Sequence, residues 1–231
     1  MPDNKQIKDG LGNLFTLRMR DISSQGDGSL QRSMFYATSY PIDYGPGGIF
    51  QNVAASGVMA SSLPANSTIY SFWWGSTTML AVISSVRIMA WTASATPFTV
   101  QGPAEFDFYA ARPFTVQDTG GTSINLAGDT NQLRSSMNAS QAAIEIAGTG
   151  GLNPGTRTLD AYPMQSQIIA VPLTLSTPFS PLPVPLFEKT VEEQHPLVLA
   201  GNEGFVINAT VPAPGTWQFS ITLRWAEVAS Y

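Results

Sequence analysis

Only a few side chains in this sequence have the chemistry for catalysis or metal binding. His195 is the only histidine, and the chain has no cysteine. Glu188, Glu192 and Glu193 stand nearby in the sequence, but the paired spacing that zinc ligands adopt is missing. Because His195 immediately precedes Pro196 at the expected start of a strand, we interpret it as a structural or exposed residue.

Paired carboxylates would be another route to catalysis. Glu105 and Asp107 occupy alternate positions of an expected strand, so their side chains share one face. A glycosidase needs two such groups to converge on a glycosidic bond, but here the opposite face is aromatic, which leaves this face to solvent. Four aspartates in loops lack the dense spacing of a calcium site: Asp43, Asp118, Asp129 and Asp160. We therefore expect no enzyme, no metal and no cofactor.

The charge of the chain limits its partners. The net charge is −5, only 12% of residues are charged, and no Lys/Arg cluster occurs, so we expect no direct contact with nucleic acid. The polar N-terminus does not resemble a signal peptide, and the most apolar window, residues 79–93, is too short to span a bilayer. We expect a protein made in the cytoplasm with no membrane partner. The scarcity of charge suggests that neighbouring molecules cover much of its surface.

Apolar residues recur with period two along much of the chain, which predicts an all-β protein. The pattern is clearest near the C-terminus, where alternate residues form one apolar face: Trp217, Phe219, Ile221, Leu223 and Trp225. Residues 205–211 alternate in the same way, and the Pro/Gly turn at 212–215 then predicts an antiparallel hairpin. Further strands are predicted at residues 67–74, 80–91, 105–111, 142–146 and 168–175.

These strands predict an antiparallel β-sandwich that is jelly-roll-like, although alternation alone leaves the strand order open. Long Gly/Ser/Thr-rich loops occupy residues 118–155, within which 131–137 are predicted to form a short helix. We divide the chain into an extended N-terminal arm or first hairpin, residues 1–35, and a β-sandwich domain, residues 36–231.

Three features are candidates for contacts with other subunits. The arm contains an apolar patch. Trp73 and Trp74 are adjacent in a strand and point to opposite faces, so one of them should reach solvent or a partner. A proline-rich strap, residues 178–187, must be extended because its prolines exclude a helix. The candidate interface residues are therefore Leu14, Phe15, Leu17, Trp73, Trp74, Pro178, Phe179, Pro181, Pro183 and Pro185.

Several short segments of the sequence resemble segments of small virion structural proteins of tailed bacteriophages. These segments are His195–Leu199, Asn202–Ile207, Gly215–Trp217, Trp225–Val228, Leu133–Met137 and Gly155–Ala161. The resemblance extends from about residue 60 to the end of the chain, and the N-terminal third departs most from it.

The resemblance implies a β-rich subunit on the surface of the phage particle, with a capsid decoration or cement protein as the specific expectation. Such a protein would form a homo-oligomer, expected to be a trimer, and would bind the major capsid protein on the outside of the head. It would bridge neighbouring capsomers against the pressure of the packaged DNA.

Two alternatives stay open at this point. A tail- or fibre-associated protein would bind host glycans through its β-sandwich, with the loops of residues 118–155 and Trp73 or Trp74 as the receptor site. A polysaccharide-degrading enzyme would need a convergent acid pair, which the sequence does not show. Oligomer symmetry, head or tail location, and the host are likewise left open.

Overall fold

The computed structural model describes residues 47–231 except 61, 95, 129 and 190–194, together with two strands near the N-terminus. The chain forms two compact units, residues 1–42 and residues 43–231. In the first unit, β1 (Asn4–Lys8) pairs with β2 (Leu14–Arg18) in antiparallel orientation. Leu14, Phe15 and Leu17, which are expected at an interface, belong to β2, but their side chains lie outside the described part of the structure.

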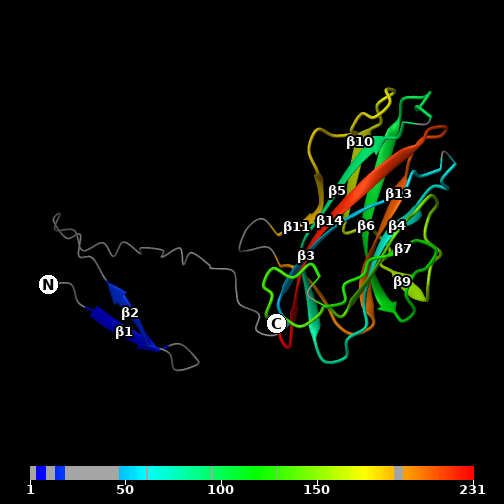
Figure 1. Ribbon diagram of the computed structural model, residues 1–231. Coiled ribbons are helices and arrows are strands. Elements are labelled where there is room, and N and C mark those ends of the chain that lie inside the picture. Colours follow the sequence, from blue (N-terminus) through cyan, green and yellow to red (C-terminus); the bar gives the residue numbers. More distant parts are fainter. Residues whose placement is uncertain are drawn as a thin grey trace, which may run out of the picture. The chain divides into compact units, whose positions relative to one another are not determined.

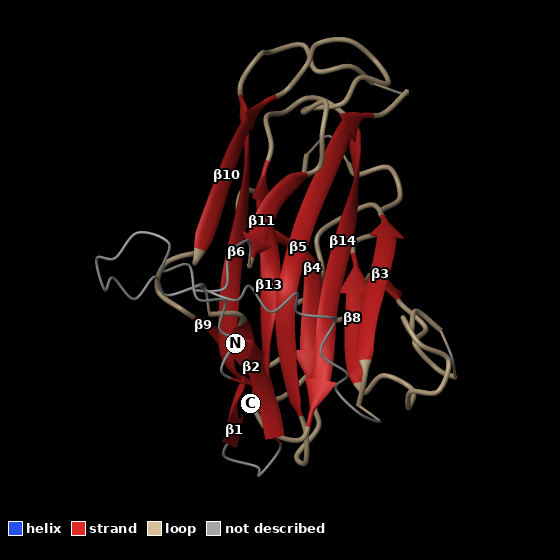
Figure 2. Ribbon diagram, turned by 90° about the vertical axis from the view of Figure 1, so that its left-hand side faces the viewer, coloured by secondary structure: helices blue, strands red, loops and turns tan. Residues whose placement is uncertain are grey.

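The second unit, which we call the body, is a sandwich of two antiparallel β-sheets (Figure 1 and Figure 2). Among the described residues, the larger sheet has seven strands: β10 (Gln165–Ala170), β6 (Pro103–Phe114), β13 (Glu203–Thr210), β4 (Ser67–Trp74), β8 (Ala142–Ile146) and β7 (Thr122–Ser123) in spatial order, with β9 (Arg157–Leu159) also on β6. The smaller sheet has five: β11 (Val184–Glu188), β5 (Leu80–Thr92), β14 (Trp217–Val228) and β3 (Ile49–Ala55) in order, with β12 (Leu197–Leu199) also on β5.

Eight of these strands form a jelly roll. Along the chain they are β3, β4, β5, β6, β10, β11, β13 and β14, and every step between them except that from β6 to β10 crosses from one sheet to the other. The resulting orders, β11-β5-β14-β3 and β10-β6-β13-β4, are those of two interlocked Greek keys. The structure thus confirms the jelly-roll-like sandwich and adds its strand order. The strands β7 to β9 are an insertion between β6 and β10.

Aromatic side chains fill the space between the two sheets. In β14 the five residues predicted to form the apolar face, from Trp217 to Trp225, are all buried. Phe72 of β4 stacks on Phe205 of β13 with ring centroids 5.2 Å apart, and it meets Trp225 edge-on at 5.8 Å. The contact between Phe72 and Trp225 joins the two sheets directly.

The predicted hairpin of residues 205–225 is wrong. Strand β13 pairs with β4 and β6 in the larger sheet, whereas β14 pairs with β3 and β5 in the smaller sheet. Residues 211–216 therefore carry the chain across the sandwich. The prediction failed because both strands turn their apolar faces toward the same core, and the alternation is identical for a strand of either sheet.

Residues 131–137 form turns rather than the predicted helix. Within the described ranges the structure has no helix, and so none that is long and apolar enough to cross a membrane. The Gln51 N–H donates to Asn131 O, and the Leu133 N–H donates to Ile49 O, both at 3.0 Å. These bonds to β3 engage backbone groups that a helix would have paired internally.

Candidate interaction surface

Four loops meet at one end of the body. They connect β3 to β4 (residues 56–66), β5 to β6 (93–102), β10 to β11 (171–183) and β13 to β14 (211–216). Strand pairing brings their ends together, because Thr92 lies opposite Trp217, Pro103 opposite Ala170, and Ser67 opposite Ala209. We call this end the neutral tip, and it is uppermost in Figure 1.

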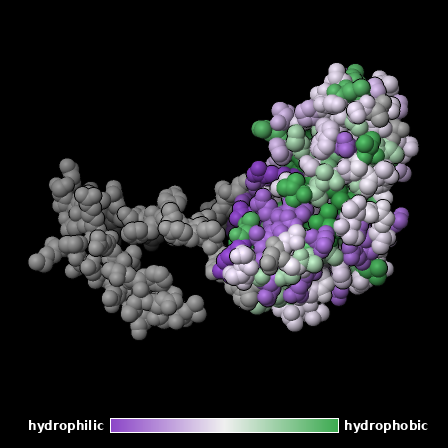
Figure 3. Space-filling view, in the orientation of Figure 1, coloured by the Kyte–Doolittle hydropathy of each residue, from purple (hydrophilic) through white to green (hydrophobic). Residues whose placement is uncertain are grey.

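The neutral tip carries no charged residue. None of its four loops contains Asp, Glu, Lys, Arg or His, although the whole chain has a net charge of −5. The long connection that follows β6, by contrast, contains Asp118, Arg134, Arg157 and Asp160. Figure 3 shows most of the strongly hydrophilic residues in the lower half of the body and pale or hydrophobic ones around the upper end. The polarity of the surface therefore changes along the sandwich.

Aliphatic side chains are exposed at the neutral tip. Leu182 exposes 71% of its surface and Val100 exposes 57%, and Val58, Leu173 and Leu175 are exposed as well. Exposed apolar side chains that gather at one end of a folded protein are typical of a surface that contacts another macromolecule. Depletion of charge is also typical of the centre of protein–protein interfaces.

Hydrogen bonds hold the loops of the neutral tip in place. The Thr216 N–H donates to Thr96 O at 2.9 Å, and the Thr96 N–H donates to Thr216 Oγ1 at 3.0 Å. At the end of β5, the Thr92 hydroxyl donates to Thr174 O at 2.6 Å, and the Thr177 N–H donates to Thr92 Oγ1 at 2.9 Å. These bonds hold the loops in one arrangement, and an ordered surface of this kind loses little conformational entropy on association.

Aromatic residues fill the underside of the neutral tip. Phe98 meets Phe179 with ring centroids 5.9 Å apart, and Phe179 meets Trp217 at 6.2 Å. Gly215 lies so close to this cluster that a Cβ there would be 2.3 Å from Phe98 Cδ1. The loops therefore rest on a packed aromatic layer, which gives the tip a defined shape.

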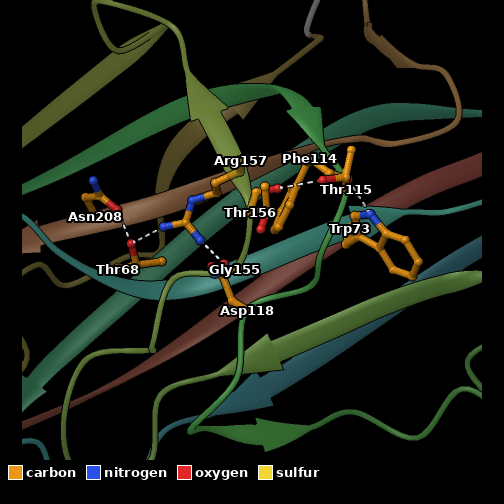
Figure 4. A network of polar contacts seen from close by, with 9 residues as sticks. All are labelled: Thr68, Trp73, Phe114, Thr115, Asp118, Gly155, Thr156, Arg157 and Asn208. Atoms are coloured by element: carbon orange, nitrogen blue, oxygen red, sulfur yellow. Dashed lines mark hydrogen bonds and ion pairs between the residues drawn. The ribbon is translucent and has the colours of Figure 1, made fainter.

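A buried polar network holds the insertion between β6 and β10 against the outer face of the larger sheet (Figure 4). Arg157 of β9 forms an ion pair with Asp118, and Asp118 Oδ1 also accepts the Gly155 N–H at 2.8 Å. Arg157 Nη2 donates to Thr68 Oγ1 at 2.8 Å, and the Thr68 hydroxyl donates to Asn208 Oδ1 at 2.8 Å. The network links β9 and the segment after β6 to β4 and β13.

The environment of this network suits a structural role. The Asp118 side chain is fully buried and that of Arg157 is 5% exposed. The guanidinium lies over the Phe114 ring, 5.5 Å from its centroid, and burial lowers the pKa of Arg157 to about 10. At neutral pH the arginine is therefore still charged and the ion pair intact. An enclosed ion pair of this kind fixes β9 and the segment after β6 on the sheet beneath them.

The residues singled out for chemistry lie in separate places. Glu105 and Asp107 are on the outer face of β6, where the Ser166 hydroxyl donates to Glu105 at 3.3 Å. The His195 ring meets Tyr231 edge-on, with centroids 5.4 Å apart. In the part of the chain that the structure describes, no three His, Cys, Asp or Glu side chains are placed to hold a metal ion.

The predicted interface residues of the body differ in their surroundings. Trp74 is fully buried and donates from Nε1 to Met79 O at 2.9 Å, and Phe179 is buried beneath the neutral tip, so both contribute to the core. Trp73 is half-buried beside Phe114, whose carbonyl O accepts its Nε1–H at 2.6 Å. The prolines of the strap are all exposed: Pro178, Pro181, Pro183 and Pro185. For Trp73 and these prolines, a role in binding stays a prediction.

The sequence analysis missed the neutral tip, although the sequence contains a signal for it. The four tip loops fall within long stretches that lack any charged residue: 44–86, 88–104, 161–187 and 204–223. Only the strand order shows that these stretches converge, and the alternation pattern does not give that order.

No family model, no curated protein and no solved structure matches this chain. The observations that bear on function are therefore the jelly roll, the neutral tip and the resemblance of short sequence segments to phage virion proteins.

Proposed function

We propose that this chain is a structural protein of a bacteriophage virion, and specifically a capsid decoration protein that binds the outside of the head and bridges neighbouring capsomers. The observation that carries this proposal is the neutral tip. An ordered, charge-free surface with exposed leucines and valines is suited to binding a complementary protein surface.

The fold supports the same proposal. Jelly rolls occur in viral capsid proteins, in lectins and in cupins, so the topology fits a virion subunit without requiring one. The segments Asn202–Ile207 and Trp225–Val228 add a resemblance to phage virion proteins in particular. The major capsid protein is accordingly the proposed partner of the neutral tip.

The symmetry of a capsid explains how a modest contact surface suffices. A decoration protein meets the same site many times on one shell, and linked copies bind with much higher avidity than a single copy. The homotrimer expected from the resemblance stays a prediction, as does the contribution of the arm.

Binding to undecorated heads tests the proposal. Leu182→Asp places a carboxylate on the neutral tip, and Val116→Asp is the matched control because Val116 is 53% exposed but lies beyond the opposite end of β6. We expect Leu182→Asp to lose at least about tenfold in affinity in a cosedimentation assay, since an unpaired charge in a neutral interface costs more than about 1.4 kcal/mol.

The control should cosediment as the unchanged protein does, and both variants should show the same thermal unfolding. Equal binding by Leu182→Asp and the unchanged protein would show that the neutral tip does not bind heads. Binding of the purified protein to host glycans, with none to heads, would instead favour the tail- or fibre-associated alternative.

A further inference from the structure

The larger sheet ends on β10, and the second edge of this strand has no strand partner among the described residues. Figure 2 shows β10 as the outermost strand on its side of the body. Its sequence, Gln165–Ala170, contains no charge and no proline, and its pairing with β6 runs without a bulge. Natural sheets usually protect an open edge with a charged residue, a proline or a bulge, and β10 has none of these.

In the part of the chain that the structure describes, the other three edges of the sandwich are each protected by a proline, a bulge, a covering segment or a short strand. Strand β11 contains Pro185 and an irregular register beside it. The start of β3 is covered by residues 131–133 through backbone hydrogen bonds. Strand β7 has only two residues. By comparison, β10 is a six-residue strand in which every residue is at least partly exposed.

Apolar side chains surround the open edge. Ile168 exposes 68% of its surface on the outer face of β10, and Tyr162 and Met164, just before the strand, are exposed too. On the other face, the amide nitrogens of Gln165 and Gln167 donate to Pro185 O at 3.5 and 3.1 Å, which ties β10 to β11. The edge is thus held in place while its outer face offers apolar surface.

We propose that the β10 strands of two copies of this chain pair with each other in antiparallel orientation, so that the two larger sheets become one. Strand addition of this kind uses main-chain hydrogen bonds for affinity, and a two-fold contact joins the same surface of both copies.

The distribution of charge favours a second copy as the occupant. No residue between Asp160 and Glu188 is charged, so two acidic molecules meet at this edge without direct repulsion. The nearest charge on the neighbouring strand, Glu105, lies opposite Ile168. In the joined sheet two Glu105 residues would be separated by three strand spacings, about 14 Å, which exceeds the Debye length of about 8 Å at physiological salt.

The period of the strand restricts the register. Residues that face each other across an antiparallel pair must lie on the same side of the sheet. A two-fold axis at Ile168 meets this condition and sets Ser166 opposite Ala170, and Gln167 opposite Ile169. Ile168 then packs on Ile168 of the second copy, which buries the most exposed side chain of the strand.

This pairing goes beyond the proposed function, because it does not depend on the neutral tip or on any particle. Its smallest closed product is a dimer, so the expected homotrimer would need a separate contact. Attachment to heads and pairing through β10 are tested by different variants and can fail separately.

The absence of cysteine from the chain allows a direct test with the full-length protein. Ile168→Cys places two thiols together at the proposed axis, within the reach of a disulfide. Val53→Cys is the control, since Val53 is 62% exposed in β3 on the opposite edge of the sandwich. Under mild oxidation, we expect Ile168→Cys to form covalent dimers at least roughly tenfold faster than Val53→Cys, because pairing raises the effective thiol concentration.

Light scattering of the unchanged protein provides the second measurement. We expect a dimer that Ile168→Lys converts to a monomer with no change in thermal unfolding. Equal rates of disulfide formation by the two cysteine variants would overturn the proposal, and so would an unchanged protein that stays monomeric, or a trimer that Ile168→Lys leaves intact.

Discussion

Arg157 and Asp118 show at the scale of single residues how the insertion is held on the jelly roll. Asp118 forms an ion pair with the Arg157 guanidinium and accepts the Gly155 N–H, while Arg157 Nη2 donates to Thr68 Oγ1 on β4. Removing one member of a buried pair leaves the other charged and desolvated, which is far more costly than losing an exposed pair.

We therefore predict that Arg157→Ala lowers the free energy of unfolding by about 3–5 kcal/mol, as measured by urea denaturation. Arg87→Ala is the matched control, because Arg87 pairs with Glu188 at the surface with 44% of its side chain exposed, and it should cost about 1 kcal/mol or less. Similar losses for the two variants would show that the buried network does not hold the insertion.

Glu227 gives the body an unusual dependence on pH. This residue is 1% exposed, and its carboxylate accepts hydrogen bonds from the Ser140 hydroxyl at 2.5 Å and from Trp225 Nε1 at 3.1 Å. Desolvation raises the pKa of Glu227 despite these bonds and that from the Gln141 N–H. The contribution of this group to stability is therefore fully present below the unfolded value of about 4.5 and is lost as the pH rises through the folded value.

It follows that the unchanged protein should gain stability relative to Glu227→Gln as the pH falls from neutrality toward about pH 5. Glu227→Gln is the reference for the unchanged protein, since glutamine keeps the size of the side chain but does not titrate in this range. Urea denaturation of both proteins at several pH values measures the difference. A difference that is constant, or that moves in the opposite direction, would contradict the raised pKa.

At the scale of elements, the neutral tip depends on close packing between its loops. Gly215, in the loop from β13 to β14, is buried against Phe98 in the loop from β5 to β6, and Phe98 in turn contacts Phe179. We predict that Gly215→Ala displaces Phe98 and lowers the free energy of unfolding by about 1–3 kcal/mol.

Gly148→Ala is the control for this substitution, because a Cβ at Gly148 meets no atom within 4 Å. It should leave the midpoint of thermal unfolding nearly unchanged, whereas Gly215→Ala should lower it. A Gly215→Ala protein as stable as the control would mean that the loops of the tip are not packed against one another as described.

The elements also show what sequence reasoning can and cannot recover. The strand predicted at residues 67–74 is β4 with the same bounds, and that predicted at 80–91 is β5 to within one residue, because both segments are mainly apolar and rich in aromatic and β-branched residues. The strand predicted at 168–175 is instead β10 at Gln165–Ala170, since Pro172 ends the apolar run early. Alternation of apolar and polar residues indicates that one face of a strand is buried, but it does not show which sheet the strand joins.

At the scale of the whole molecule, the strand order turns four separated stretches of sequence into one surface. The jelly roll brings the loops after β3, β5, β10 and β13 to the same end, and all four lack charge. The composition alone predicts that neighbouring molecules cover part of the surface, and only the topology shows where the charge-free loops gather. Among the described candidate residues, by contrast, Glu105 and Asp107 lie on the outer face of β6, and His195 lies apart from them against Tyr231.

The central claim is that this chain coats the head of a phage particle, and its copy number in purified particles tests that claim most directly. Quantitative mass spectrometry gives the ratio of this chain to the major capsid protein. The account predicts a ratio near one or a simple fraction such as about one third, because a decoration protein follows the symmetry of the shell. A ratio of roughly a few hundredths would place the chain at the portal, tail or fibres and would contradict the decoration role.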